Sequence, residues 1–134
     1  MTAHITAHIT ALYAGLCGLL IIYLAFNVTS FRKRKVAEGH ADFSAMQVAI
    51  RAHGNAVEYI PIAMILLFLA ELGGTAPMWL HVFGASFVAS RVAHAHGYIK
   101  SQGGASRGRF FGTATCFLVI TILAVINIVS FVNF

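Results

Sequence analysis

The chain has 134 residues, of which 59% are hydrophobic and only 10% are charged. A soluble globular domain carries about 25% charged residues, so this composition excludes an ordinary soluble protein and indicates an integral membrane protein. The length fits a single domain, which we place at residues 1–134. The formal net charge is +5, but its placement is more informative: no Lys or Arg occurs before residue 32, between residues 52 and 90, or after residue 109.

Four apolar segments follow one another, and they predict an all-α fold of four transmembrane helices. The first covers residues 9–31, contains no charged side chain and is longer than the roughly 20 residues that a bilayer core requires. It ends at the basic run Arg32–Lys35. The second covers residues 45–72, contains Pro61, where we expect a kink, and ends before a Gly-rich turn.

The third predicted helix covers residues 77–99, and the fourth covers residues 109–132 after a Gly- and Ser-rich loop. Every Lys and Arg lies near one membrane face, in or beside the connections that join helices one to two and three to four. The positive-inside rule places these connections in the cytoplasm and both termini outside it. The sequence therefore predicts a multi-pass membrane protein with both termini on the side opposite the cytoplasm.

Polar side chains interrupt the second segment where an apolar helix should exclude them. Arg51, Asn55 and Glu58 recur at positions i, i+4 and i+7, which places them within about 60° of one another on a helix. Counting back from the turn after residue 72 places them at or near membrane depth. Charged groups at that depth usually face the interior of a bundle, so this stripe needs a partner or a ligand.

A second polar stripe occupies the end of the third segment, where Arg91, His94 and Tyr98 recur at i, i+3 and i+7. Together with Arg107 and Arg109 in the next loop, the two stripes hold more cations than anions. Such a set suits a ligand with two carboxylates and one ammonium group, as in glutathione. An arginine near the thiol of that ligand would favour the nucleophilic thiolate.

Simpler interpretations of these residues stay open at this point. Glu58 could form an ion pair with Arg51 or Arg91 that only holds the bundle together. The basic run Arg32–Lys35 could serve topology alone. We expect no metal site, because histidines at positions 94 and 96 lie on different faces of a helix.

The first stripe and its neighbours resemble the signature at the start of the second transmembrane helix in the MAPEG family, the membrane-associated proteins in eicosanoid and glutathione metabolism. The pattern reads Arg51-x-x-x-Asn55-x-x-Glu58-Tyr59-x-Pro61. Two further matches read Arg91-x-x-His94-x-x-Gly97-Tyr98 and Arg109-x-x-Gly112. The resemblance covers nearly the whole chain, and the short loops are similar to those of bacterial members. Together with the charge placement, this implies a bacterial inner-membrane protein with periplasmic termini and cytoplasmic basic loops.

The resemblance implies a left-handed four-helix bundle that assembles as a homotrimer and binds glutathione as co-substrate between adjacent subunits. It implies a membrane-bound glutathione transferase, with peroxidase activity as a further expectation, that attacks hydrophobic electrophiles or lipid hydroperoxides in detoxification. Arg109 is the expected catalytic residue that stabilises the thiolate, and Arg107 is the alternate. With the stripe residues included, the expected glutathione-binding residues are Arg32, Arg51, Asn55, Glu58, Tyr59, Arg91, His94 and Tyr98.

Two other functions compete with this interpretation. The first is a non-catalytic lipid-binding or scaffold protein of the same fold, since His94 stands where the synthase branch of the family has a tyrosine and a fold alone does not establish activity. The second is a small four-helix exporter, which would need a buried acidic residue in its first helix. Residues 9–31 contain none, which argues against an exporter. No nucleic-acid partner is expected.

Overall fold

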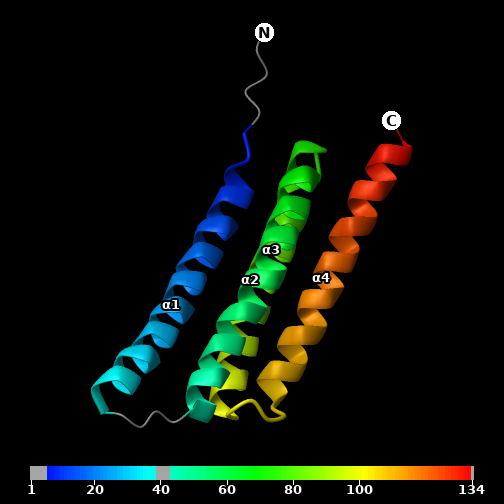
Figure 1. Ribbon diagram of the computed structural model, residues 1–134. Coiled ribbons are helices and arrows are strands. Elements are labelled where there is room, and N and C mark those ends of the chain that lie inside the picture. Colours follow the sequence, from blue (N-terminus) through cyan, green and yellow to red (C-terminus); the bar gives the residue numbers. More distant parts are fainter. Residues whose placement is uncertain (1–5, 39–42, 134) are drawn as a thin grey trace.

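The computed structural model of this chain is a bundle of four long α-helices (Figure 1). It describes residues 6–38 and 43–133, with the side chains of residues 35–38 and 43 left aside. The helices are α1 (His8–Glu38), α2 (Phe43–Leu72), α3 (Pro77–Lys100) and α4 (Arg107–Val132). No strand occurs in these ranges, so the predicted all-α fold of four helices is confirmed.

Five helix ends differ from the predicted boundaries, and the end of α1 and the start of α4 matter most for the site. Helix α1 continues past residue 31 to Glu38, because Arg and Lys are good helix formers and the basic run extends the helix instead of ending it. Helix α4 begins at Arg107, two residues before the predicted start at residue 109. Ser106 caps this end, and its side-chain oxygen accepts a hydrogen bond from the backbone N–H of Arg109 at 3.2 Å.

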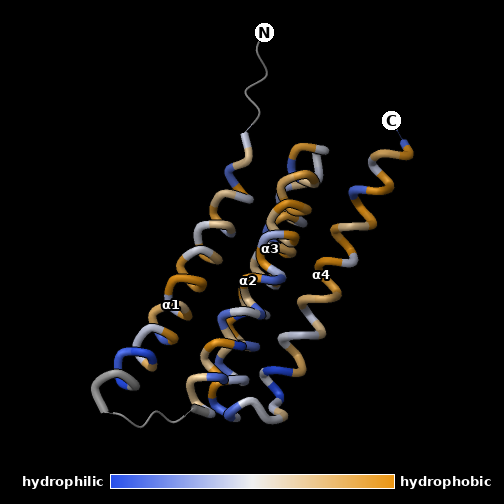
Figure 2. Tube along the Cα trace, in the orientation of Figure 1, coloured by the Kyte–Doolittle hydropathy of each residue, from blue (hydrophilic) through white to orange (hydrophobic). Residues whose placement is uncertain are grey.

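The helices alternate in direction, so the start of α1 and the end of α4 lie at one end of the bundle (Figure 1). The end of α1, the start of α2 and the α3–α4 loop lie at the opposite end, which we call the loop end. Hydrophilic residues gather toward the loop end on α1, α2 and α4 (Figure 2). This is the distribution expected from the positions of Lys and Arg, and the assignment of the loop end to the cytoplasm stays a prediction.

Three of the helices described are long and apolar enough to cross a membrane, namely α1, α2 and α4. Helix α3 has 24 residues, which span about 36 Å, but Arg91 and three histidines make it more polar. It contacts all three other helices and buries Arg91 and His94 among them. The most polar helix therefore runs through the bundle, where its polar side chains are shielded from lipid.

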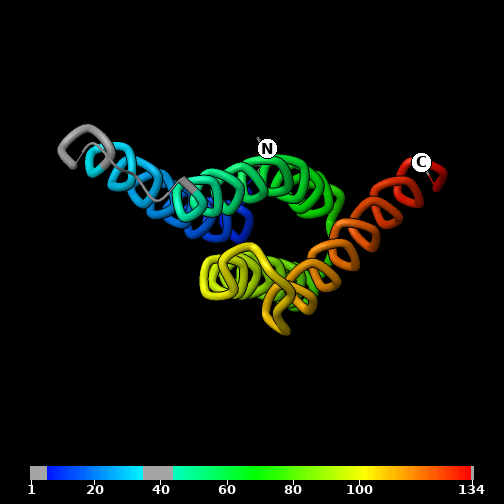
Figure 3. The backbone as a smooth tube through the Cα atoms, turned by 60° about the horizontal axis from the view of Figure 1, so that its bottom comes forward, coloured from blue at the N-terminus to red at the C-terminus, as the bar shows by residue number. Residues whose placement is uncertain are grey.

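Helices α2 and α3 form the centre of the bundle, and α1 and α4 diverge from each other on either side (Figure 3). Helix α1 contacts α2 and α3, and α4 contacts the same two. The apolar core between them includes Leu24, Leu67, Leu80, Phe87 and Leu123, each less than 2% exposed. Large apolar side chains also cover the outer faces of α1 and α4, as expected for helices that face lipid or another subunit.

Helices α3 and α4 approach each other at backbone distance along Gly97, Gly108 and Gly112, which we call the α3–α4 seam. A Cβ added to Gly112 would lie 2.6 Å from the carbonyl oxygen of Ser90, and one added to Gly97 would lie 2.7 Å from the backbone nitrogen of Arg109. Small residues permit this close helix packing in membranes. The seam fixes the position of the start of α4 against the end of α3.

At the opposite end of the bundle, a carboxylate on α2 forms hydrogen bonds to the start of α1. Glu71, at the end of α2, accepts hydrogen bonds from the backbone N–H groups of Ile9 (3.0 Å) and Thr10 (2.7 Å). These groups belong to the first turn of α1, which has no intrahelical acceptors for them. A negative charge is also favourable at a helix N-terminus, so Glu71 joins α2 to α1.

Candidate functional site

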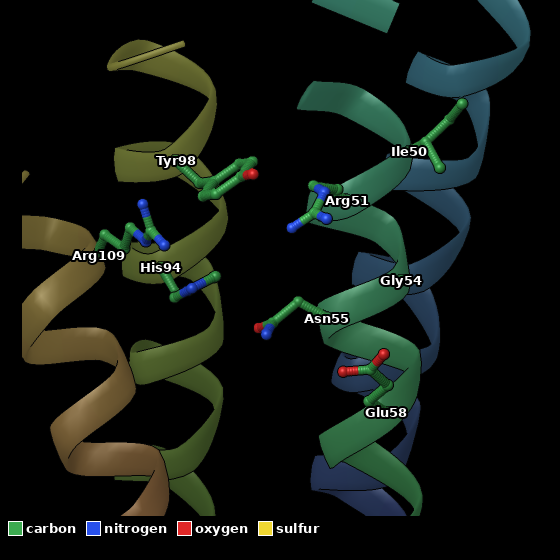
Figure 4. A pocket seen from close by; sticks show the side chains of 8 residues that line it. All are labelled: Ile50, Arg51, Gly54, Asn55, Glu58, His94, Tyr98 and Arg109. Atoms are coloured by element: carbon green, nitrogen blue, oxygen red, sulfur yellow. The ribbon is translucent and has the colours of Figure 1, made fainter. Parts of the chain in front are cut away.

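A cavity of about 410 Å³ opens at the loop end between α2 and the α3–α4 pair (Figure 4). We call it the polar cavity. It is lined by Ile50, Arg51, Gly54, Asn55, Glu58, His94, Tyr98 and Arg109. Its size falls within the roughly 300–1,000 Å³ typical of small-ligand sites. Both polar stripes seen in the sequence therefore contribute to one cavity.

The α2 wall of the polar cavity carries the first stripe. Arg51 and Asn55 extend from α2 toward the side chains of α3 (Figure 4). Arg51 and Glu58 are exposed, whereas Asn55 is half-buried. Glu58 forms no ion pair with Arg51 or Arg91 in the described part of the chain, so the structural ion pair considered as an alternative is not present. The carboxylate of Glu58 is therefore available to a ligand.

Arg91 lies behind this wall and is only 3% exposed. Its guanidinium donates one hydrogen bond from Nη1 to Oδ1 of Asn55 (2.8 Å) and one from Nη2 to the carbonyl oxygen of Gly112 (2.9 Å). It also lies 5.6 Å from the ring centroid of Tyr59, a cation–π distance. Arg91 thus joins α2, α3 and α4, and it fixes the amide of Asn55 so that the amide N–H groups remain free to donate.

The opposite wall is a stack of two rings and a guanidinium. The rings of His94 and Tyr98 stack with centroids 5.9 Å apart and an interplanar angle of 16°. Arg109 lies 4.9 Å from the centroid of Tyr98, and its Nη1 donates to the carbonyl oxygens of Gly103 (2.9 Å) and Gly104 (3.1 Å). Gly103 adopts a positive φ of 82°, which glycine tolerates. Arg109 is therefore held in place before any ligand arrives.

The two candidate catalytic arginines lie on different sides of α4. Arg109 lines the polar cavity, whereas Arg107 lines a separate cavity with His96 and Lys100. Positions two residues apart on a helix differ by about 200°, so only one of the two can face α2. Of the pair, Arg109 has the position from which a group in the polar cavity can be reached.

Tyr59 and Arg32, which the sequence analysis also assigned to glutathione binding, do not line the polar cavity. The Tyr59 ring packs over Arg91 and against Phe117, with ring centroids 5.6 Å apart. Arg32 is exposed near the end of α1. Arg91 is likewise behind the cavity wall, so in this chain it orients another residue instead of lining the cavity.

Sequence reasoning missed several contributors to the site. Gly54 and Ile50 complete the α2 wall, and the spacing of Gly54 from Arg51 on the stripe was a usable signal for it. The carbonyl oxygens of Gly103 and Gly104 accept hydrogen bonds from Arg109, and that of Gly112 accepts one from Arg91. No sequence pattern marks a backbone carbonyl as an acceptor for a distant side chain.

The charges around the polar cavity are unequal. Arg51 and Arg109 line it and Arg91 lies directly behind, while Glu58 supplies the one carboxylate in its lining. Within the described ranges, no group of three or more His, Cys, Asp or Glu could hold a metal ion. The arrangement suits an organic ligand that is mainly anionic and carries one ammonium group.

Comparison with known proteins identifies the family to which the chain belongs. The MAPEG family model matches residues 10–129. The chain is also 43% identical over 91 residues to "Inner membrane protein YecN" of Escherichia coli strain K12, an alignment that covers 67% of this chain and 70% of that protein. The protein of the same name from Escherichia coli O6:H1 matches to the same extent. The chain is a membrane protein and belongs to the MAPEG family.

Proposed function

We propose that the protein is a glutathione transferase that binds glutathione in the polar cavity and activates its thiol. The observation that supports this most directly is the set of two arginines and one carboxylate around a single cavity of about 410 Å³. Glutathione carries two carboxylates, one ammonium group and one thiol. Guanidinium groups bind carboxylates in a planar, paired geometry, and a carboxylate binds the ammonium.

Each lining residue then has a distinct role. Arg51 and the amide of Asn55 bind a carboxylate, Glu58 binds the ammonium, and Tyr98 and His94 form the wall against the peptide. Arg109 faces the sulfur and stabilises it as the thiolate after its proton leaves for water. Nη1 of Arg109 already bonds to the loop carbonyls. These bonds hold the guanidinium in place, so its other N–H groups need no reorganisation when the charge develops on sulfur.

The thiolate then acts as the nucleophile. On an electrophilic carbon, a C–S bond forms and the leaving group departs with its electron pair. On a lipid hydroperoxide, the sulfur attacks the terminal oxygen and the O–O bond breaks, which gives a glutathione sulfenic acid and an alkoxide that takes up a proton. A second glutathione converts the sulfenic acid to glutathione disulfide and water.

The exposed surface of α2 supports a hydrophobic second substrate, and the family resemblance supports the trimeric assembly. Beyond Glu58, α2 presents Ile62, Ile65 and Leu69, each more than 40% exposed, as an apolar path from the bilayer to the cavity. We place the protein in the bacterial inner membrane as a homotrimer, with the loop end in the cytoplasm where glutathione is available. Arg32 then contributes to the site of a neighbouring subunit.

The test is thiolate formation in the purified full-length protein, followed by ultraviolet absorbance after mixing with glutathione. Arg109→Gln should lower the apparent equilibrium constant for thiolate formation about 100-fold, as expected for loss of a pre-placed charge donor. Arg34→Gln on α1 is the control, because Arg34 is exposed outside the cavity. Unchanged thiolate formation in Arg109→Gln would contradict the assigned mechanism, and a loss in Arg107→Gln alone would transfer the role to the other cavity.

Equilibrium binding of glutathione distinguishes the proposed transferase from its competitor. A non-catalytic lipid-binding or scaffold protein of the same fold would bind no glutathione at millimolar concentration. We expect saturable binding, and we expect it to weaken when Arg51 is replaced by Ala. Calorimetric titration in detergent measures both.

A further inference from the structure

A second cavity of about 410 Å³ lies at the loop end, and the proposed glutathione chemistry does not use it. Its walls include the side chains of His96, Lys100 and Arg107 together with the seam residues Gly97 and Gly108. We call it the basic cavity. No acidic residue lines it, so its charge is entirely positive or neutral.

The basic cavity lies on the other side of α3 from the polar cavity. His94 and Tyr98 line the polar cavity, while His96 and Lys100 line the basic cavity. Each pair is displaced from the other by two residues, or about 200° around the helix. The α3–α4 seam separates the two cavities, so a ligand in one does not occupy the other.

The positive charges of the basic cavity are not neutralised by acidic side chains of the described residues. Lys100 and Arg107 are exposed, and within residues 6–38 and 43–133 neither side chain has an ion-pair or hydrogen-bond partner. Two long basic side chains at one membrane face, without acidic partners, attract an anion. Unlike Arg91 and Arg109, they have no structural contacts to maintain.

An apolar groove of about 230 Å³ adjoins the basic cavity between α1 and α3, and the two share His96. Its walls include Leu20, Tyr23, Val92, Ala95 and Ile99. Val92 and Lys100 are eight residues apart on α3, which corresponds to about 12 Å along the helix axis. A ligand that fills both spaces therefore has an anionic head at the membrane surface and an apolar chain that extends into the bilayer.

We propose that the basic cavity and the apolar groove together bind one anionic glycerophospholipid. Lys100 and Arg107 contact the phosphate and the rest of the anionic head, and one acyl chain lies along α3 past Ile99 and Val92. Basic pockets between transmembrane helices bind anionic lipid heads in this manner. The site is independent of the proposed glutathione chemistry, because it lies across α3 and shares none of the residues that line the polar cavity.

Lipid titrations of the purified full-length protein in neutral detergent, read by native mass spectrometry, test the proposal. The probes are phosphatidylglycerol, phosphatidylcholine with the same acyl chains, and soluble glycerol 3-phosphate. We expect saturable binding of phosphatidylglycerol, weaker binding of phosphatidylcholine, and little competition by glycerol 3-phosphate. Equal affinity for the two lipids, or full competition by glycerol 3-phosphate at the lipid's own concentration, would overturn the assignment.

Paired variants separate this site from general attraction to a basic surface. Lys100→Gln with Arg107→Gln should weaken phosphatidylglycerol binding roughly 30-fold, from two interfacial charges. Lys33→Gln with Arg34→Gln removes the same charge from exposed positions on α1 and should change the affinity less than about 3-fold. Equal effects of the two pairs would mean non-specific attraction and would refute the site.

The groove has its own pair of variants, which leave the charge unchanged. Val92 is 48% exposed, and Val92→Trp should fill the groove and weaken lipid binding about 10-fold. Val125→Trp is the control, since Val125 is 52% exposed on α4 away from the groove. Unchanged binding in Val92→Trp would exclude the acyl-chain position.

Efficient cross-linking between copies of the chain through benzoylphenylalanine at position 23, in the presence of lipid, would identify this face as a subunit interface instead.

Discussion

The two cavities at the loop end have similar volumes and lie on opposite sides of α3, but they hold their cations differently. Arg109 in the polar cavity is bound to two loop carbonyls and to the Tyr98 ring, and Arg91 behind it is bound to Asn55 and Gly112. Arg51 at the polar cavity is exposed, as are Lys100 and Arg107 in the basic cavity, so the difference between the cavities lies in Arg91 and Arg109. Fixed guanidinium groups select a ligand by geometry, whereas flexible exposed cations select it by charge. The first arrangement suits one small thiol, and the second suits a lipid head.

The largest effect is expected where the close packing of α3 against α4 is disturbed. A Cβ on Gly112 would lie 2.6 Å from the Ser90 carbonyl oxygen and 2.7 Å from the His94 nitrogen, so Gly112→Ala should force α3 and α4 apart. We expect a loss of about 3 kcal/mol of stability, together with weaker binding of both glutathione and lipid. Denaturant titration in detergent and the two binding assays measure these changes.

Gly15→Ala is the matched control for the seam variant. Gly15 lies on α1, and a Cβ there meets no atom within 4 Å. Replacing a helical glycine with alanine at such a site should stabilise the protein by up to about 1 kcal/mol and leave both ligands unaffected. If Gly112→Ala changed stability and the two ligand affinities only as Gly15→Ala does, the close contact at Gly112 would not be what positions α4 against α3.

A smaller effect that is confined to the polar cavity is expected from Glu58→Gln. Glu58 lines the cavity and has no ion-pair partner among the residues that the structure describes, so it should bind the ammonium of glutathione. Its loss should weaken glutathione about 10-fold, as for a hydrogen bond to a charged group. A glutathione analogue without the amino group should bind the variant and the wild type equally. A similar loss for that analogue would show that Glu58 acts in another way.

Arg91→Lys should weaken glutathione about 5-fold, because an ammonium group cannot bond to Asn55 and Gly112 in the way a planar guanidinium does. The cause would be a freely rotating Asn55 amide, so Arg91→Lys and Asn55→Ala should be non-additive in a double-mutant cycle. Lipid binding should not change. Additive effects would mean that Arg91 acts through its charge and not through Asn55.

The smallest effect is expected at the far end of the bundle. Glu71→Gln weakens the acceptor for the backbone N–H groups of Ile9 and Thr10 and should cost about 1 kcal/mol of stability. Both ligand affinities should stay at the wild-type value, because the loop end is built by other contacts. A change in either affinity would show that the two ends of the bundle are coupled.

Much of the fold was predictable because few kinds of structure can span a membrane, and the apolar composition of the chain indicates a membrane protein. Uncharged stretches of sufficient length predict helices, and the spacing of Arg51, Asn55 and Glu58 predicts a common helix face. The structure brings these residues together with His94, Tyr98 and Arg109. The longer α1 and the earlier start of α4 were missed, because basic residues mark the end of a membrane span without ending the helix.

The sequence by itself determined the number of helices, the end of the bundle that collects the charge, and which residues share a face of each helix. Only the tertiary structure decided that Arg109 and not Arg107 lines the polar cavity, that Arg91 is buried behind Asn55, and that Tyr59 packs against Phe117. The physical reason is that the sequence does not set the rotation of each helix about its own axis relative to its neighbours. Helical spacing sets angles about a helix's own axis, but the orientation of one helix toward the next depends on close packing, here at the glycines of the α3–α4 seam.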